Sequence, residues 1–249
     1  MDEAHHTIYG QRARLGLIVP ASNTVCEPEM VRLSPPGVAT YATRILFSPT
    51  IQDLKNMQHR VQRAAQELSS ECIADLIIFC CTVGSLIEGL RGESEIVSNI
   101  EKEASVPAIT VATAVKTAFD ALHVRRLAVA TPYTREINNH EKDILEQAGY
   151  EITSIAGYYE NLEPTELRNM MIGNLPAEAA LELGVKVNSS DNEAIFISCT
   201  NFRAADIIEK LEAATGKPVI SSNQASMWFA LRRLGLRDKV SGYGRLFEM

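Results

Sequence analysis

The chain repeats one stretch of sequence: Asp75-Leu-Ile-Ile-Phe-Cys-Cys81-Thr82 returns as Glu193-Ala-Ile-Phe-Ile-Ser-Cys199-Thr200. Two further pairs of segments match at nearly the same separation. They are Arg14-Leu-Gly-Leu-Ile-Val-Pro20 with Arg126-Leu-Ala-Val-Ala-Thr-Pro132, and Val106-Pro-Ala-Ile-Thr110 with Lys217-Pro-Val-Ile-Ser221. Separations of 112, 118 and 111 residues in three blocks indicate an internal duplication. We therefore expect the two thiols to occupy equivalent places and to face each other across a pseudo-two-fold cleft.

Size and composition are typical of a soluble globular protein. The 249 residues, 46% of them hydrophobic, suffice for one large domain or for two of about 110–120 residues each. A net charge of −7 argues against nucleic acid as the main partner, because phosphate binding needs clustered Lys and Arg. No apolar run reaches the ~20 residues that span a bilayer, and the polar start has no signal-peptide pattern. We expect a cytoplasmic protein with no membrane partner and with its five cysteines reduced.

Short apolar strands alternate with amphipathic segments, a pattern typical of a mostly parallel sheet covered by helices. The expected fold class is α/β, with two pseudo-symmetric open parallel-sheet halves and the active site in the cleft between them. In the first half we expect strands near 14–20, 38–46, 75–81 and 107–110, with the clearest helices at 52–73 and 111–123. In the second half we expect strands near 126–131, 151–157, 194–199 and 218–221, and helices near 134–148, 165–184, 202–214 and 223–234.

The predicted crossover between the halves lies near 111–125. Residues 1–116 would form the first half and 117–226 the second, with 227–249 packing back on the first. No Pro/Gly-rich linker separates the halves, which predicts that they pack closely. Ligands of open α/β sheets bind beyond the carboxyl ends of the strands, where the two cysteines of the repeat are expected.

The repeated Cys-Thr pairs are the first candidates for chemistry. A thiol at a strand end, just before a helix, meets oriented N–H groups that lower its pKa. Thr82 and Thr200 are placed to cap the helices that follow and to donate hydroxyl groups into the same space. An isolated free cysteine is most often a core residue, but duplication favours a catalytic role for Cys81 and Cys199. Cys80 should point to the opposite face of its strand and belong to the core.

Three polar residues near the same rim are candidates for substrate binding. Asn23 follows the first strand and would either donate its amide to a substrate carboxylate or cap a helix. Tyr133 follows the duplicated Pro132 and would place a phenol at the mirrored position, unless it is an ordinary core or surface tyrosine. Asn161 follows the second strand of the second half and, by itself, is a loop asparagine.

Several motifs of other enzyme classes are missing. No G-x-G-x-x-G follows the first strand, and no His/Cys/Asp cluster has zinc-site spacing. The five histidines fall away from the predicted rim, which argues against a Cys–His pair. We therefore expect neither a cofactor nor a metal.

Together these segments resemble the aspartate/glutamate racemase superfamily, whose members have two pseudo-symmetric α/β halves with one cysteine in each. The chain looks most similar to the branch that contains maleate cis–trans isomerases and arylmalonate decarboxylases. The similar stretches are Gly16-Leu-Ile-Val-Pro-Ala-Ser-Asn23-Thr24, Cys81-Thr-Val-Gly-Ser85 and Ser198-Cys199-Thr200-Asn201-Phe-Arg203. Amino-acid racemases of the superfamily have Cys-Asn-Thr where this chain has Cys81-Thr82, and the decarboxylases have glycine at position 81. Val83 replaces a serine expected in this branch.

The resemblance implies a cofactor-independent maleate cis–trans isomerase. It implies Cys81 as the nucleophile and Cys199 as the acid/base on the other face of the substrate. By the same resemblance, a small dicarboxylate would be held by groups of the substrate-binding set Asn23, Thr82, Val83, Tyr133, Asn161, Thr200 and Asn201. We expect a homodimer or a higher homo-oligomer.

Other functions use the same two thiols. In a two-base racemase or epimerase each thiol would serve one face of an acidic carbon, and a malonate-type decarboxylase would also need no cofactor. A non-catalytic binding protein for small acids would have unreactive thiols. A cysteine rather than glycine at position 81, without asparagine directly after it, favours the isomerase.

Overall fold

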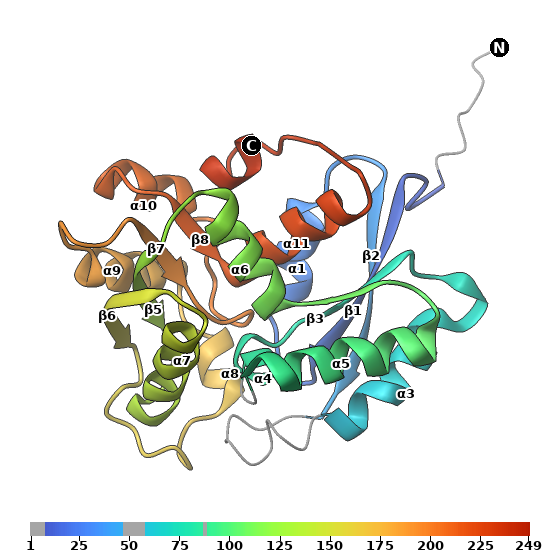
Figure 1. Cartoon of the computed structure of the whole chain (residues 1–249), viewed down its shortest axis with the longest axis horizontal. Coiled ribbons are helices and arrows are strands. Elements are labelled where there is room, and N and C mark those ends of the chain that lie inside the picture. The colour runs from blue at the N-terminus through green and yellow to red at the C-terminus, as the bar shows by residue number, and fades with distance from the viewer. Residues whose placement is uncertain (1–7, 47–57, 87–88) are drawn as a thin grey trace.

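Two parallel sheets of four strands, each with the same strand order, form the fold (Figure 1). The structure is a computed structural model that describes residues 8–46, 58–86 and 89–249. The first sheet has the order β2-β1-β3-β4 and the second has the order β6-β5-β7-β8. The strands are β1 (Ala13–Pro20), β2 (Val38–Ile45), β3 (Leu76–Phe79), β4 (Ala108–Thr110), β5 (Arg126–Thr131), β6 (Glu151–Gly157), β7 (Ala194–Ile197) and β8 (Val219–Ser221). The predicted α/β fold with two pseudo-symmetric parallel sheets is confirmed.

Helices connect the strands and cover the sheets. They are α1 (Cys26–Leu33), α3 (Gln58–Ser69), α4 (Thr82–Leu86), α5 (Gly89–Ala104), α6 (Val111–Ala121), α7 (Arg135–Gln147), α8 (Asn169–Gly173), α9 (Ala177–Val187), α10 (Ile208–Thr215) and α11 (Ser222–Arg233), with 3-10 turns η1 (Ser70–Cys72) and η2 (Arg245–Glu248). The first residues of the helix expected over 52–73 lie outside the described residues.

Two expected helices differ from the structure for local reasons. The helix expected over 165–184 is divided into α8 and α9, because Pro176 stands at the N-cap of α9 in an extended conformation. Proline has no N–H and disfavours the helical conformation of the residue before it. The helix expected from residue 202 begins only at Ile208; a turn precedes it, and the N–H groups of Ala204 and Ala205 bond to Oε1 of Glu29.

Both apolar cores contain residues of the two sheets. Ile18 and Ile197 belong to one core, and Leu17 and Val129 belong to the other. Burying apolar surface from both sheets together stabilises their relative placement. The two sheets that border the cleft are therefore held in one relative position.

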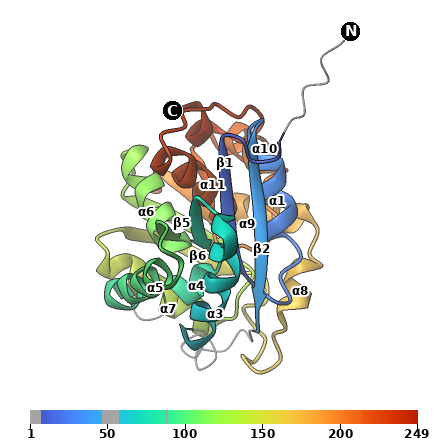
Figure 2. The same ribbon diagram turned by 90° about the vertical axis from the view of Figure 1, so that its right-hand side faces the viewer.

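Helices α6 and α11 are counterparts in the duplication and pack against each other between the two sheets (Figures 1 and 2). Thr110 caps α6 by accepting a hydrogen bond from the N–H of Thr113. Ser221 caps α11 in the same way and, with Gln224, completes a capping box. α11 also contacts α1 and β3 of the first half and β8 of the second. The predicted domain boundaries and the packing of 227–249 on the first half stay predictions.

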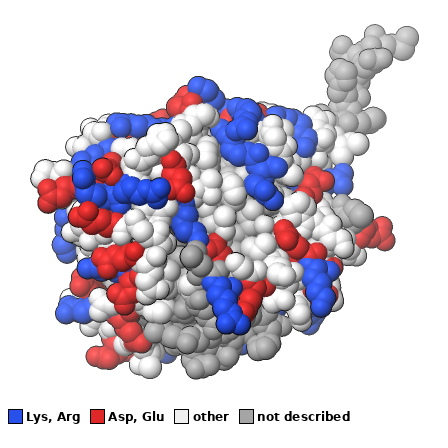
Figure 3. Space-filling model, viewed as in Figure 1, with Lys and Arg blue, Asp and Glu red and all other residues white. Residues whose placement is uncertain are grey.

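Charged side chains of both signs are interspersed on the face shown in Figure 3. The chain has 24 basic and 31 acidic residues, so its overall field is negative. Within the described residues, no helix combines the length and the apolar character needed to cross a membrane.

Candidate active site

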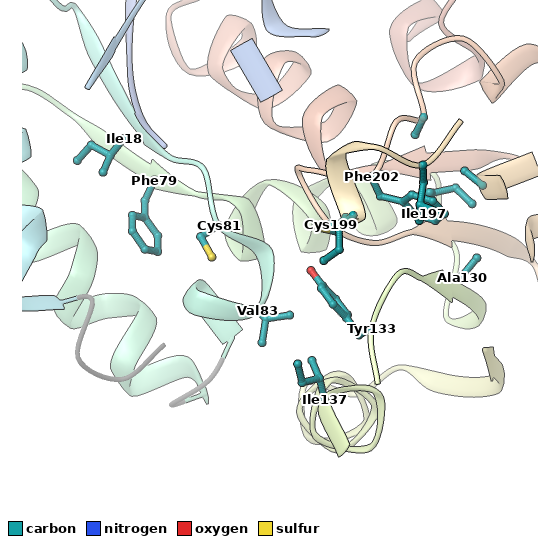
Figure 4. Close-up of a cluster of buried hydrophobic side chains, with 14 of the residues drawn as sticks. Ile18, Phe79, Cys81, Val83, Ala130, Tyr133, Ile137, Ile197, Cys199 and Phe202 are labelled. Atoms are coloured by element: carbon teal, nitrogen blue, oxygen red, sulfur yellow. The ribbon is translucent and has the colours of Figure 1, made fainter. Parts of the chain in front are cut away.

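A pocket lies where the carboxyl ends of the two sheets meet, and residues of both sheets contribute to its wall. Its empty volume is about 370 Å³, which includes solvent space at the mouth. The lining residues are Pro20, Asn23, Cys81, Thr82, Val83, Tyr133, Ile137, Asn169, Ile172, Cys199, Thr200 and Asn201. Figure 4 shows Cys81 on one side of this space and Cys199 with Tyr133 on the other. The structure thus brings together eight of the nine predicted site residues, namely both cysteines and all of the substrate-binding set except Asn161.

Cys81 lies between the end of β3 and the start of α4. Its carbonyl accepts the N–H of Ser85 at 3.0 Å, which is the first hydrogen bond of the α4 turn. The N–H of Gly84 points at the Cys81 sulfur and hydrogen-bonds to it. Cys80 lies in the other apolar core, as the two-residue strand period predicts.

Cys199 has a left-handed backbone conformation, with φ of 99°. Such a conformation is unfavourable for a residue with a side chain and is found most often at functional sites. Three hydrogen bonds hold it in place. The Cys199 N–H donates to Ser222 Oγ at 3.1 Å, the Asn201 N–H donates to the Cys199 sulfur at 3.3 Å, and the Phe202 N–H donates to the Cys199 carbonyl at 3.2 Å.

Burial raises the pKa of the Cys81 thiol and of the Cys199 thiol to about 12 each. The expectation that the helices lower these pKa values is therefore wrong. α4 has only five residues, and no helix follows Cys199 until Ile208, so both dipoles are weak or distant. Hydrogen bonds to the two sulfurs lower the pKa values but do not offset burial. Both thiols are protonated at neutral pH.

Tyr133 stands just before α7 and points its hydroxyl at Cys199 (Figure 4). Burial raises the pKa of the phenol well above its ordinary value, so it is a hydrogen-bond donor at neutral pH. The N–H of Tyr133 donates to Thr131 Oγ1 at 3.0 Å. Gly157 allows this placement, because a Cβ there would lie 2.2 Å from the Tyr133 carbonyl oxygen.

Asn23 is both a helix cap and a wall residue of the pocket. Its Oδ1 accepts the N–H groups of Val25 and Cys26 at 3.0 and 2.9 Å, which caps α1. Its Nδ2 donates to Thr200 Oγ1 at 3.0 Å and so joins the two halves. One of its two amide hydrogens is therefore already used within the protein.

The two threonines after the cysteines also join the halves. The Thr82 hydroxyl donates to Ser222 Oγ at 2.9 Å, and the Thr200 hydroxyl donates to the Cys80 carbonyl at 3.0 Å. The two threonines were predicted to cap the helices that follow. Thr82 is instead the first residue of α4, with its hydroxyl on Ser222, and Thr200 begins a turn. Val83 presents its apolar side chain to the pocket, where a serine would have presented a hydroxyl.

Asn201 and Asn169 form a linked pair at the second-half wall. Nδ2 of Asn201 donates to the Asn169 carbonyl at 2.7 Å and to its Oδ1 at 3.1 Å, and Oδ1 of Asn201 accepts the N–H of Thr24. Asn169 also donates to Ser22 Oγ at 3.0 Å. Asn169 was not predicted from the sequence, because it lies in a short helix far along the chain from either repeat block.

Asn161 does not lie at the pocket. Its side chain is exposed and accepts a hydrogen bond from Arg135 at 3.3 Å. The structure places Asn169 at the wall instead, since the chain between β6 and α8 leaves the rim after Gly157 and returns only with α8. Among the described residues, no three His, Cys, Asp or Glu side chains gather closely enough to hold a metal ion.

Comparisons with known proteins agree on one family. A sequence model of the arylmalonate decarboxylase family matches residues 15–247. A maleate isomerase of Nocardia farcinica is 28% identical over 94% of this chain and 95% of its own length. An arylmalonate decarboxylase of Bordetella bronchiseptica is 27% identical over 94% and 96%. A cysteine-to-alanine variant of the maleate isomerase Iso from Pseudomonas putida S16, solved with maleate, is similar with a TM-score of 0.85 and 26% identity, covering 94% of this chain and 97% of that one.

Proposed function

The chain belongs to the arylmalonate decarboxylase family, and we propose that it is a maleate cis–trans isomerase that converts maleate to fumarate. One observation carries the proposal: Cys81 and Cys199 line the same pocket from two different sheets. A flat alkene between them would meet one thiol on each face. The decarboxylases that the chain resembles have glycine at position 81, and a cysteine there favours the isomerase.

Covalent catalysis by Cys81 removes the barrier to rotation. The Cys81 thiol first loses its proton to solvent at the pocket mouth, so only its small thiolate fraction reacts. The thiolate adds to one alkene carbon, and the π electrons move toward the adjacent carboxylate. Cys199 donates its proton to the second carbon, which gives a succinyl thioether with a carbon–carbon single bond. After rotation the Cys199 thiolate takes a proton back from that carbon, the carbon–sulfur bond breaks, and fumarate leaves. Addition and elimination are redox-neutral, so the proposal needs no cofactor.

Neutral donors would bind the two carboxylates. Among the described residues that line the pocket there is no Lys or Arg. Tyr133 and Asn169 supply a hydroxyl and an amide, and Asn23 has one amide hydrogen left. Backbone N–H groups of Thr82 and Val83, in the first turn of α4, have no carbonyl partner within that helix and are suited to the enediolate charge. Thr200 and Asn201 shape the opposite wall.

The proposal extends to the assembly and its setting. We expect a homodimer, because most oligomers of soluble enzymes are symmetric dimers. We expect the protein to work in the cytoplasm, where its thiols stay reduced. The division into residues 1–116 with 227–249 and residues 117–226 is part of the same proposal.

Proton NMR of the purified chain with maleate in D₂O tests the reaction. We expect the maleate signal to be replaced by that of fumarate with no cofactor added. Release of carbon dioxide from an arylmalonate without isomerisation of maleate would instead indicate a decarboxylase. Deuterium entering an otherwise unchanged chiral acid would indicate a racemase, and neither turnover nor exchange would indicate a binding protein.

Mass spectrometry of Cys199→Ser with maleate tests the nucleophile. In this variant the second carbon takes its proton from solvent instead, but no thiolate takes that proton back. The thioether should therefore accumulate, and Cys81 should carry the added mass of one maleic acid. Cys80→Ser is the control, because Cys80 lies in the other core and should not be needed for adduct formation or turnover. An adduct on any other cysteine, or turnover by Cys81→Ser near the unmodified rate, would contradict the assignment.

A further inference from the structure

Glu141 is a fully buried carboxyl group that the proposed mechanism does not use. It lies on α7 with none of its surface exposed. Its Oε1 accepts a hydrogen bond of 2.6 Å from the hydroxyl of Ser198, the residue directly before Cys199. Its Oε2 has no hydrogen-bond partner among the described residues. A bare carboxylate oxygen in a protein interior is costly, so its presence next to the site calls for a physical account.

The duplication supplies a comparison. Glu29 matches Glu141 in the sequence repeat, since it lies 112 residues earlier, the separation of Arg14 from Arg126. Glu29 accepts three hydrogen bonds, from the N–H groups of Ala204 and Ala205 at 2.8 and 2.9 Å and from Asn223 Nδ2 at 2.7 Å. Glu29 is thus a satisfied structural anchor. Glu141, at the matching position of the sequence repeat, accepts one side-chain hydrogen bond, and its Oε2 has no partner among the described residues.

The charge of Glu141 acts on one side of the pocket. Its negative charge raises the pKa of two groups, Cys199 after β7 and Tyr133 before α7. Ile137, one helical turn before Glu141 on α7, lines the pocket together with both of them. The elements packed against α7 are β6 and α4. α4 contains no titratable residue, and the single one in β6, Glu151, is exposed at the start of that strand.

We propose that Glu141 is a positioning residue whose buried negative charge keeps the proton on Cys199 and so makes that thiol the proton donor of the pair. The sequence repeat makes the two thiols equivalent and burial raises the pKa of both, but the Glu141 charge adds to that rise at Cys199 and not at Cys81. The inference rests on the acid/base role proposed for Cys199.

The charge of Glu141 changes close to neutral pH. Burial raises the pKa of Glu141 to about 7, and the Ser198 hydrogen bond opposes that rise. Above about pH 7 the group is an anion, and its repulsion of a second negative charge raises the pKa of Cys199 and of Tyr133. Below that pH it is neutral and the repulsion is lost. A variant without the charge should therefore differ from the parent only on the alkaline side.

Alkylation of Cys199 measures this effect without substrate. Both proteins carry Cys81→Ala, one with Glu141 and one with Glu141→Gln, and iodoacetamide is the probe. The tryptic peptide 187–203 contains Cys199 as its single cysteine and reports its modification. We expect equal rates at pH 6 and a rate about tenfold higher in Glu141→Gln at pH 8.5, the effect of one pKa unit on the thiolate fraction. Equal rates at both pH values would overturn the inference.

Two further variants keep the test decisive. Ser198→Ala retains the carboxyl group of Glu141 but removes the hydrogen bond that stabilises its charge. The bend in the profile of alkylation rate against pH, which marks the titration of Glu141, should therefore move above about pH 7. An unmoved bend would contradict the proposal. Glu29→Gln removes the equivalent anchored carboxyl, and the bend should remain. No result depends on maleate, so a failure of the isomerase proposal and a failure of this inference are read from different experiments.

Discussion

At the scale of single residues, the two cysteines are equivalent in the repeat but differ in their backbone. Cys81 begins a helical turn, whereas Cys199 is held at φ of 99° by hydrogen bonds to its N–H, its sulfur and its carbonyl. A residue in that region costs of order 1–3 kcal/mol, which the surrounding bonds must offset. This backbone conformation places the Cys199 thiol at the pocket, and the neighbouring Glu141 charge raises the pKa of this thiol but not that of Cys81.

The raised thiol pKa values predict how isomerisation depends on pH. With a pKa of about 12 for Cys81, the thiolate fraction grows about tenfold for each pH unit below that value. We expect kcat/KM for maleate to rise with a slope near one in logarithmic units between about pH 6.5 and 9. Cys199 stays protonated over the same range. A profile that is flat above pH 7 would show that Cys81 is already a thiolate and would contradict this prediction.

Asn169 and Asn161 form a matched pair for testing carboxylate binding. Asn169 lines the pocket and Asn161 is exposed outside it. Asn169→Ala should lower kcat/KM about tenfold to one-hundredfold, because a hydrogen bond to a charged group contributes about 1.5–3 kcal/mol. Asn161→Ala should stay within about twofold of the parent. Steady-state kinetics with maleate decide, and an equal loss in both variants would exclude a specific role for Asn169.

Glu141 also predicts a pH dependence of stability. Its native pKa of about 7 lies above the ordinary 4.5, so the native state holds the proton more tightly than the unfolded chain. Stability from this group is full below about pH 4.5 and is lost as the pH rises to about 7, by about 3 kcal/mol in total. Glu141→Gln should therefore gain stability over the parent at pH 8 relative to pH 5. Urea unfolding at the two pH values measures the difference, and a constant difference would refute it.

The sequence predicted those site residues that directly follow a strand. Asn23, Cys81, Tyr133 and Cys199 each lie within a few residues of a strand end, and parallel strands bring their carboxyl ends to one rim. Asn169 follows no strand, so no local pattern pointed to it. The thiol pKa values could not be predicted either, because burial depends on packing by distant segments.

At the scale of elements, strands were easier to predict than helices. All eight strands begin and end within two residues of their predicted ranges, and β3 (LIIF) and β7 (AIFI) are wholly apolar. Helix ends depend on competing hydrogen bonds. Glu29 takes the N–H groups of Ala204 and Ala205, and Pro176 separates α8 from α9. Both differences affect the site. The residues after Cys199 form a turn rather than a helix, and the separate helix α8 places Asn169 at the pocket wall.

The junction of β6 with α7 gives a prediction at this scale. A Cβ at Gly157 would lie 2.2 Å from the Tyr133 carbonyl and 2.5 Å from Asn138 Nδ2, so the start of α7 must shift. Gly157→Ala should cost about 1–3 kcal/mol of stability, because the start of α7 is overpacked. It should also lower kcat, because the Tyr133 hydroxyl moves away from Cys199. Ser154→Ala on the same strand is the control for a small side-chain change. Full activity in Gly157→Ala would contradict the positioning role of this contact.

At the scale of the whole molecule, the two halves are joined rather than merely adjacent. Both apolar cores contain residues of each sheet. Hydrogen bonds cross between the halves at the site, from Asn23 to Thr200 and from Thr200 to the Cys80 carbonyl. Helices α6 and α11 pack together between the sheets. Neither sheet could leave the other without exposing apolar surface and buried polar groups.

This joining predicts that the chain unfolds in one cooperative transition. Trp228 on α11 is the single tryptophan and is 6% exposed, so its fluorescence reports on the packing of that helix. Far-UV circular dichroism reports on all helices, and we expect both signals to change at the same urea concentration with the same slope. Thr200→Val removes two buried hydrogen bonds between the halves and should lower the midpoint by the equivalent of about 2–4 kcal/mol while keeping a single transition. Shared cores should leave no stable half behind. Two separated transitions in the parent would therefore contradict the prediction and would mean that the sheets are independent folding units.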